Sequence, residues 1–405
     1  MNRVSHTRFS PWRLLRRLFK PLPLEHRRSG WKLWATQLVE KPFLRLKRLE
    51  SQLMIGMPSK PENVLLMDVI NQWSFYNPDA KIQTPTLLLH GYATSSMCYH
   101  RNMPQLSEGI KHLYTIDLPA NGLSKELPLE LDIAKPIVFK PEFNSVKSEF
   151  HIPYTIDGLH HRCAIQKLED YYIDSIELWR RKNSLGAINL VGHSFGGYIS
   201  FKYSIKYPQN VKKLCLISPI GVERNIYSVH NNWRSNCPYS IDYEDPSSKH
   251  FANKTMIPEF VFNEQTKLLR LMGPLGAKLG WKYINAVYSK VPNFLYLEFI
   301  FTLIYGKNVM TDTSRNIFTY LFTNSLLARD PMLDSLEHLH VDKLLMLYGE
   351  HDWVRSQPGK MMVEEFNKQR SHPSGTLTVV PDASHNLFLD NPVFFNVALL
   401  NFLKE

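Results

Sequence analysis

The chain has 405 residues, of which 44% are hydrophobic and 21% are charged, a balance typical of a globular protein with one large core or two smaller ones. Its net charge of +11 is concentrated at one end, because residues 1–50 hold 13 Lys and Arg against three acids. The rest of the chain is therefore nearly neutral. This distribution argues against a nucleic-acid-binding domain, which carries its positive charge on a folded face.

Several other classes of protein are excluded by simple patterns. The best candidate for a membrane-spanning helix, Phe294–Tyr305, is too short and contains Glu298. The four cysteines are far apart and form no C-x-x-C pair, which argues against a disulfide framework or a zinc site. No glycine-rich nucleotide fingerprint, metal-ligand cluster or internal repeat is evident. We therefore expect neither a cofactor nor a bound metal.

Residues 1–30 form a basic leader. No acid precedes Glu25, and residues 11–20 (PWRLLRRLFK) have helical periodicity, with Trp and Leu on one side and Arg on the other. Ser10 and Pro11 suit the start of this helix and Pro21 its end. Such a helix fits a mitochondrial targeting segment, an anchor in an anionic membrane interface, or a solvated basic tail. A peripheral position on the inner mitochondrial membrane is the expected location, and a lipid droplet or cytoplasmic membrane surface is the alternative.

The body of the chain alternates between strands and helices. Residues 31–80 predict helices followed by the first antiparallel strands. Apolar runs at 85–90, 113–117, 187–191 and 214–218 then alternate with helical segments, which indicates a parallel sheet covered on both faces. Residues 126–165 are polar and aperiodic and are predicted to be an insertion, after which 171–179 predict a helix. Active sites of such folds lie at the carboxyl ends of the strands. His90, Asp117, Ser194 and Ser218 fall at such ends.

The alternation breaks over residues 221–336 and resumes with strands at 344–349 and 376–380 and a final helix at 393–403. We expect a core over 60–220 and 337–405, with 221–336 inserted as a helical cap. The apolar residues of this cap, at 260–262, 268–272, 281–288 and 294–301, suit an acyl-chain tunnel, a surface that docks on membranes, or ordinary packing on the core. Its basic residues either meet phosphate headgroups or are solvated; they are Lys267, Arg270, Lys278 and Lys282.

The motif with the most chemical content is residues 191–197, VGHSFGG, directly after an apolar strand and before a helix. In this context, a G-x-S-x-G sequence holds its serine on a sharp turn at the end of the sheet. Ser194 is therefore the predicted nucleophile. The alternative is a glycine-serine turn that only caps a helix.

A serine hydroxyl needs a base, and that base works best beside an acid that fixes its tautomer. In this kind of fold the chain order is nucleophile, acid, histidine. Asp352 follows the strand at 344–349 and His385 follows the last strand, so we assign them as acid and base. Glu350 is an alternative acid, and Asp382 is interpreted as a surface turn residue.

The oxyanion of an acyl-transfer reaction needs two backbone N–H donors. The turn after Ser194 supplies the N–H of Phe195. The second donor is predicted in the loop that follows His90 and Gly91, and it is the N–H of Tyr92. A simple strand-to-helix turn is the alternative interpretation of His90 and Gly91.

Five segments together resemble the α/β-hydrolase superfamily over about residues 80–405: LHG at 89–91, DLPANGLS at 117–124, GHSFGG at 192–197, GEHDW at 349–353 and HNLFLD at 385–390. The elbow GHSFGGY and the ending H-x4-D are similar to its lipid-acting branch. That branch contains the coactivator of adipose triglyceride lipase, the fungal cardiolipin-specific phospholipase and proteins described as lysophosphatidic acid acyltransferases. The coactivator lacks the elbow serine, so Ser194 implies an active enzyme.

The resemblance implies a serine acyl-ester hydrolase of the phospholipase A type, with a phospholipid at a membrane surface as substrate and cardiolipin favoured if the leader directs import. Three alternatives remain: acyl transfer to a lysophospholipid on the same residues, a non-catalytic lipid-droplet or lipase-binding scaffold, and an esterase of small molecules. The H-x4-D sequence matches a signature named for acyltransferases. We instead interpret Asp390 as a cap of the final helix.

Overall fold

The computed structural model describes residues 21–58, 60–129, 140–155, 157–307 and 309–404. The predicted leader helix over 11–20 lies outside these residues. Described residues begin with a 3₁₀ turn, Leu24–His26, and two helices, α2 (Gly30–Val39) and α3 (Pro42–Leu53). In this part of the chain no helix has both the length and the apolar character needed to cross a bilayer.

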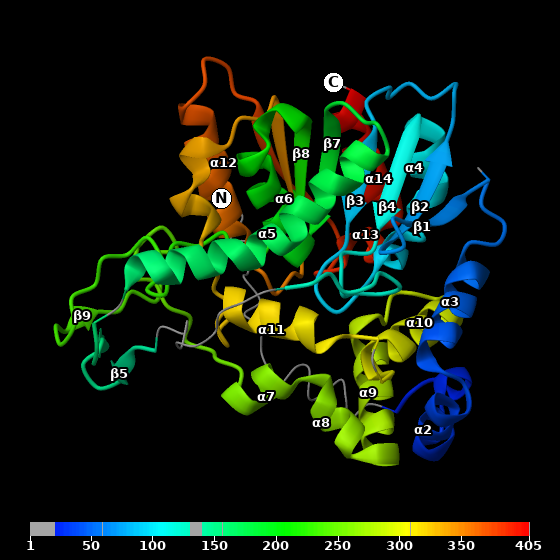
Figure 1. Cartoon of the computed structure of the whole chain (residues 1–405), viewed down its shortest axis with the longest axis horizontal. Helices are drawn as coiled ribbons and strands as arrows, with labels where there is room; N and C mark the ends of the chain where they lie inside the picture. Colours follow the sequence, from blue (N-terminus) through cyan, green and yellow to red (C-terminus); the bar gives the residue numbers. More distant parts are fainter. Residues whose placement is uncertain (1–20, 59, 130–139, 156, 308, 405) are drawn as a thin grey trace.

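The centre of the fold is an eight-stranded sheet with the order β1-β2-β4-β3-β7-β8-β10-β11 (Figure 1). β2 is antiparallel to β1 and β4, and all later neighbours are parallel. This confirms the predicted sheet. The strands are β1 (Glu62–Leu66), β2 (Ile70–Tyr76), β3 (Thr86–Leu89), β4 (His112–Ile116), β7 (Ile188–His193), β8 (Val211–Ile217), β10 (Lys343–Gly349) and β11 (Gly375–Val380).

Side chains of the central strands alternate between two cores because successive residues of a strand point to opposite faces. Leu214 and Leu216 belong to one core, whereas Cys215 and Ile217 belong to the other. The first core is covered by α5 (Gly158–Lys182), α6 (Phe195–Lys206) and α12 (Ser356–Lys368). The second is covered by α3, α4 (Met103–Gly109), α13 (Leu387–Asp390) and α14 (Pro392–Lys404). Burial on both sides explains why these strands read as continuous apolar runs.

A helical insertion leaves the sheet after β8 and returns before β10 (Figure 1). Its helices are α7 (Glu259–Glu264), α8 (Thr266–Leu271), α9 (Gly273–Val287), α10 (Phe294–Tyr305) and α11 (Asp312–Leu321). The two N-terminal helices join it, since α2 packs on α9 and α3 packs on α10. Most of α10 is buried, so this aromatic segment is part of the second core.

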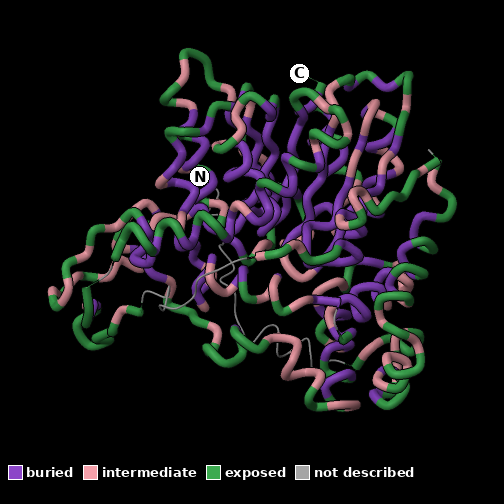
Figure 2. Tube along the Cα trace, viewed as in Figure 1, coloured by how far each residue is buried: buried purple, intermediate pink, exposed green. Residues whose placement is uncertain are grey.

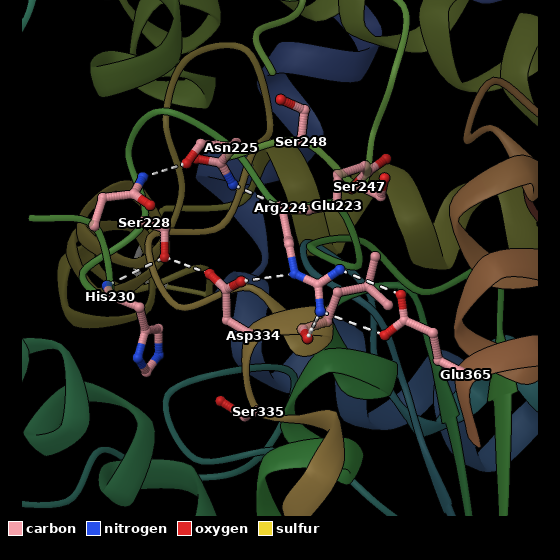
Figure 3. A network of polar contacts seen from close by, with 12 residues as sticks. Glu223, Arg224, Asn225, Ser228, His230, Ser247, Ser248, Asp334, Ser335 and Glu365 are labelled. Atoms are coloured by element: carbon pink, nitrogen blue, oxygen red, sulfur yellow. Dashed lines mark hydrogen bonds and ion pairs between the residues drawn. The ribbon is translucent and has the colours of Figure 1, made fainter. Parts of the chain in front are cut away.

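A polar network holds the two ends of the insertion together (Figure 3). Arg224, shortly after β8, donates to Asp334 at 3.1 Å and to Glu365 of α12 at 3.3 Å. Asp334 lies shortly before β10 and also accepts the hydroxyl of Ser228 at 2.5 Å. Arg224 and Asp334 lie at the two ends of the insertion, and Glu365 lies on a helix of the core. The Arg224 guanidinium therefore ties both ends of the inserted segment to the core.

Two sequence predictions about the segment around residue 150 were wrong. Helix α5 begins at Gly158 and not near residue 171, because Asp157 caps the N–H of His160 and an apolar stripe extends back to His161. Residues 126–165 are also not fully irregular. β5 (Glu142–Asn144) and β6 (Glu149–His151) form a small sheet, to which β9 (Tyr239–Ser240) adds from the cap segment. This pairing joins residues far apart in the sequence and leaves no local signal.

Burial divides the molecule unevenly (Figure 2). Buried residues concentrate in the central sheet and in the helices packed directly on it. Exposed and half-buried residues dominate α2, α8 and the small β5–β6–β9 sheet. The predicted site residues at strand ends lie in the buried part.

Candidate active site

Ser194 lies on a sharp turn between β7 and α6. Its backbone is strained, with φ 53° and ψ −114°, and its N–H donates to the carbonyl of Ile217 at 2.8 Å. A Cβ on Gly196 would collide with the carbonyl oxygen of His90, and one on Gly192 would collide with the backbone of Gly196. Gly196 therefore allows the turn to pack against the end of β3, and Gly192 allows α6 to pack against β7.

The structure brings Asp352 and His385 together, and each lies in the loop that follows its strand. His385 Nδ1 lies 3.0 Å from Asp352 Oδ1, and the Asp352 side chain is only 2% exposed. The N–H of Val354 donates to the same oxygen at 2.9 Å, and the Ser218 hydroxyl donates to the other. An ionised carboxylate can only accept, so Nδ1 of His385 carries the proton and Nε2 keeps a lone pair. This is the tautomer required of a general base.

The elbow and His385 are connected through His193, the residue before the serine. His193 Nε2 lies 3.1 Å from the carbonyl oxygen of His385, and the two rings are 4.8 Å apart. Trp353 packs on His385 at 4.7 Å. The Ser194 hydroxyl makes no hydrogen bond within the described part of the chain. Catalytic hydrogen bonds are often long before substrate binds, so a serine nucleophile and its base need not be hydrogen-bonded here.

Burial lowers the pKa of His193 well below its usual value, so this ring is neutral. A carbonyl can only accept, so Nε2 is protonated and donates to His385. This bond could not be predicted from the sequence, because the motif does not show which way His193 points.

The other carboxylates near His385 are committed elsewhere. Glu350 accepts the backbone N–H of Asp382 at 2.9 Å, and Asp382 is exposed and pairs with Lys290 at 2.5 Å. The prediction of Asp382 as a surface turn residue agrees with its positive φ of 49°. Asp352 is therefore the carboxylate that the fold brings to His385.

The prediction that Asp390 caps the final helix was wrong. Its carboxylate accepts both the N–H of Ser384, at 2.8 Å, and the Ser384 hydroxyl. Asn391 occupies the capping position instead, accepting the N–H of Phe394 at 3.3 Å. Asp390 therefore fixes the residue directly before His385. The H-x4-D spacing is the sequence signal for this contact, because Asp390 ends the short helix α13 that follows the His385 loop.

The loop after β3 lies against the elbow. A Cβ on Gly91 would lie 2.9 Å from His193 Nδ1 and 3.1 Å from Ser194 Cβ, so only glycine fits there without displacing the elbow. His90 fixes the start of this loop: its Nε2 accepts the N–H of Leu118 at 2.9 Å, and its Nδ1 lies 2.7 Å from the Gly91 carbonyl. Burial lowers the pKa of His90, which keeps the ring neutral for this pair of bonds.

The two predicted oxyanion donors border this loop and the elbow. Phe195 is the first residue of α6, so its N–H has no acceptor within the helix. Tyr92 follows Gly91, and its ring stacks on Phe318 of α11 at 3.9 Å. Its hydroxyl donates to Gln265 at 2.5 Å, at the junction of α7 and α8. This contact between the predicted oxyanion loop and the cap was not predicted from the sequence.

Asp117 also lies at a strand end, but its role is structural. It accepts the N–H groups of Ser96 at 2.7 Å and Leu123 at 2.9 Å, and the amide of Asn71 at 3.0 Å. The same Asn71 amide donates to Glu50 of α3. These bonds fix the loop after β4. Across the described residues, no group of three or more His, Cys, Asp or Glu is arranged to hold a metal.

The sheet, the serine elbow and the Asp352–His385 pair define the class of protein. Residues 84–392 match the family model of the alpha/beta hydrolase fold, and the chain belongs to this family. Among solved structures it is similar to carboxylesterase CesB of Bacillus subtilis, with a TM-score of 0.53 and 18% identity over 89% of this chain and 98% of that chain. This likeness shows the shared fold.

Sequence comparison identifies particular relatives of the chain. The chain is 46% identical to Protein ECM18 of Saccharomyces cerevisiae, over 97% of this chain and 88% of that protein. It is 41% identical to the 1-acylglycerol-3-phosphate O-acyltransferase ICT1 of the same yeast, over 89% and 93%. It is 25% identical to the mouse (Lyso)-N-acylphosphatidylethanolamine lipase, over 88% and 90%.

Proposed function

We propose that the chain is a serine acyl-ester hydrolase that removes an acyl chain from glycerophospholipids. Ser194 is the nucleophile, His385 the general base and Asp352 the acid that orients it. The single observation that carries this proposal is the 3.0 Å contact between His385 and the buried Asp352, beside a strained serine turn. Both are features that a purely structural turn does not need.

The reaction follows from these positions. His385 Nε2 takes the proton of the Ser194 hydroxyl as its oxygen attacks the ester carbonyl carbon. The N–H groups of Phe195 and Tyr92 stabilise the oxyanion that forms. The imidazolium then protonates the departing lysophospholipid oxygen, which leaves an acyl group on Ser194. A water molecule then attacks the acyl group on Ser194. His385 takes the proton of this water and returns it to the Ser194 oxygen, which releases the fatty acid, while Asp352 stays ionised throughout.

The lipid substrate is supported by the relatives, whose names specify an acylglycerol phosphate and an N-acylphosphatidylethanolamine. We also propose the core at 60–220 and 337–405 and the cap at 221–336 as the units that hold chemistry and substrate. Cardiolipin as substrate, mitochondrial import and anionic membrane contact through the leader stay predictions, and the predicted leader helix at residues 11–20 lies outside the described residues.

Acyl transfer is the second candidate, favoured by the 41% identity to ICT1. In this reaction the acyl group on Ser194 would pass to a lysophospholipid hydroxyl in place of water. Asp390 does not supply a further base for it, because both of its contacts are to Ser384. Purified chain with acyl-CoA and a lysophospholipid distinguishes the two: free fatty acid indicates hydrolysis, and a new diacyl lipid indicates transfer.

The decisive experiment in cells is lipidomics of a deletion strain rescued with wild type or with Ser194→Ala. We expect the substrate lipid to accumulate in the strain without active enzyme. Accumulation of fully acylated cardiolipin supports the deacylase, and a change confined to phosphatidic acid supports acyl transfer. Equal rescue by Ser194→Ala would instead support a non-catalytic scaffold.

A further inference from the structure

Three helices on the cap side expose large apolar side chains. Trp31 and Val39 of α2 are 68% and 88% exposed, and Leu271 at the end of α8 is 84% exposed. We call the whole set the docking face: Trp31, Leu38, Val39, Leu271, Met272, Leu275 and Leu279. Apolar patches of this kind are rare on monomeric proteins unless they bind a partner or a membrane.

These side chains form one surface because α2 packs closely on the start of α9. A Cβ on Gly30 would collide with the carbonyl of Pro274, and Trp34 Nε1 lies 4.0 Å from the Cβ position of Gly273. Trp31 in turn packs edge-to-face on Trp34 at 5.8 Å. Figure 1 shows α2, α8 and α9 together at the lower edge of the molecule. The helix that exposes Trp31 therefore packs directly on the helix that exposes Leu275 and Leu279.

Basic residues outnumber acidic ones in this region, which the acids Glu25, Glu40, Glu264 and Glu298 border. Residues 26–39 and 265–297 contain no Asp or Glu. Lys267 and Lys290 reach acids outside the face, Asp312 at 3.0 Å and Asp382 at 2.5 Å. Lys32, Lys278 and Lys282 have no carboxylate partner among the residues that the structure describes.

On α9, Lys278 and Lys282 share the outer side of the helix with Leu275 and Leu279. Basic side chains are attracted to the negative surface of an anionic membrane, and exposed apolar side chains beside them can enter its headgroup layer. A protein partner of this shape would need an acidic, apolar surface. A phospholipid layer supplies both properties without specific contacts.

The face is connected directly to the candidate active site. Helix α8 begins right after Gln265, whose side chain accepts the Tyr92 hydroxyl at 2.5 Å, and Gln265 has a positive φ of 42°. Tyr92 follows Gly91, which lies against the Ser194 turn. Helix α8 therefore joins the docking face to the loop that lies beside the serine turn.

We propose that the docking face binds the surface of an anionic phospholipid membrane, with Lys32, Lys278 and Lys282 at the headgroups and the apolar side chains below them. This inference rests on the proposed function for its substrate but not for its test. Binding needs no Ser194 chemistry, so the two ideas fail independently.

The experiment measures co-flotation of the full-length Ser194→Ala chain with vesicles of phosphatidylcholine, alone or mixed with phosphatidylglycerol. Replacing Trp31 and Leu271 by Ser should lower partitioning into mixed vesicles at least about tenfold, because each large apolar side chain left in water costs about an order of magnitude. The matched control replaces Val393 and Val397, exposed residues of α14, by Ser. It should bind like the parent chain.

A second pair of variants tests the charges. Lys278→Gln with Lys282→Gln should weaken binding to mixed vesicles several-fold at low salt and little at high salt, where surface charges are screened. Lys212→Gln with Lys368→Gln, also exposed, is the control. Unchanged flotation of the Trp31 and Leu271 variant overturns the proposal. So does equal loss in the α14 control, or a shift in oligomeric state with vesicle binding intact, which would assign the face to a protein partner.

Discussion

The rim of the sheet around Ser194 and the docking face differ in almost every physical respect. At the rim, Asp352, His193 and His90 are buried, and each has defined hydrogen-bond partners. On the docking face, apolar side chains are exposed, and Lys32, Lys278 and Lys282 beside it have no carboxylate partner among the described residues. The two regions therefore differ in what their functions require. Catalysis needs side chains held in fixed positions by the core, whereas contact with a fluid lipid layer needs only a surface of suitable composition and shape.

The largest expected effect tests whether the rim works as a catalytic unit. Asp352→Asn should lower kcat for a water-soluble p-nitrophenyl ester about 10⁴-fold, because the imidazole loses the acceptor that fixes its tautomer. Glu350→Gln is the matched control, since Glu350 bonds to Asp382 and not to His385. Similar kcat values for the two variants would show that Asp352 takes no part in catalysis.

The packing of the elbow can be broken by one methyl group. In Gly196→Ala the new Cβ collides with the His90 carbonyl, so the turn and the oxyanion loop must separate. We expect a loss of kcat of about 10²-fold and a decrease in unfolding free energy of about 1–3 kcal/mol. Gly158→Ala, whose Cβ meets nothing within 4 Å, should change neither. Full activity of Gly196→Ala would show that the close approach is unimportant.

The role of Asp390 is a finer test of the same region. Asp390→Ala should reduce kcat about tenfold with little change in KM, because the loop before His385 loses both of its anchors. Asn391→Ala, which removes only a helix cap, should cost about 1 kcal/mol of stability and leave kcat unchanged. If Asp390→Ala instead lowered stability without changing kcat, and Asn391→Ala lowered kcat, Asp390 would be the helix cap.

The last prediction concerns the stability of the structure that supports the rim and not its chemistry. Burial and the nearby Asp117 charge raise the pKa of Glu50 to about 8 from an ordinary 4.5. Between these values the folded chain holds a proton that the unfolded chain has released, so stability should fall as pH rises from about 5 to 8, by at most about 1.4 kcal/mol per pH unit. Melting temperatures of Glu50→Gln should lack this decline. Glu108→Gln, which is exposed, should keep it; equal pH profiles for wild type and Glu50→Gln would refute the assignment.

The two regions were not equally visible in the sequence. The elbow and the order of Ser194, Asp352 and His385 were predictable because each residue follows a strong apolar strand. The bond between Asp390 and Ser384, the contact from Tyr92 to Gln265 and the pairing of β9 with β6 were not, since they depend on how distant segments pack. On the cap, the sequence showed an apolar and basic composition. Only the fold separates buried α10 from the exposed residues of α2, α8 and α9.

The central claim is that Ser194 is a reactive alcohol activated by His385. The most direct measurement is labelling of the full chain with a fluorophosphonate, followed by mass spectrometry of the modified peptide. We predict a single label on Ser194, loss of ester hydrolysis in proportion to labelling, and labelling slowed by several orders of magnitude in His385→Ala. Modification of another residue, or ester hydrolysis that persists in Ser194→Ala, would contradict this account.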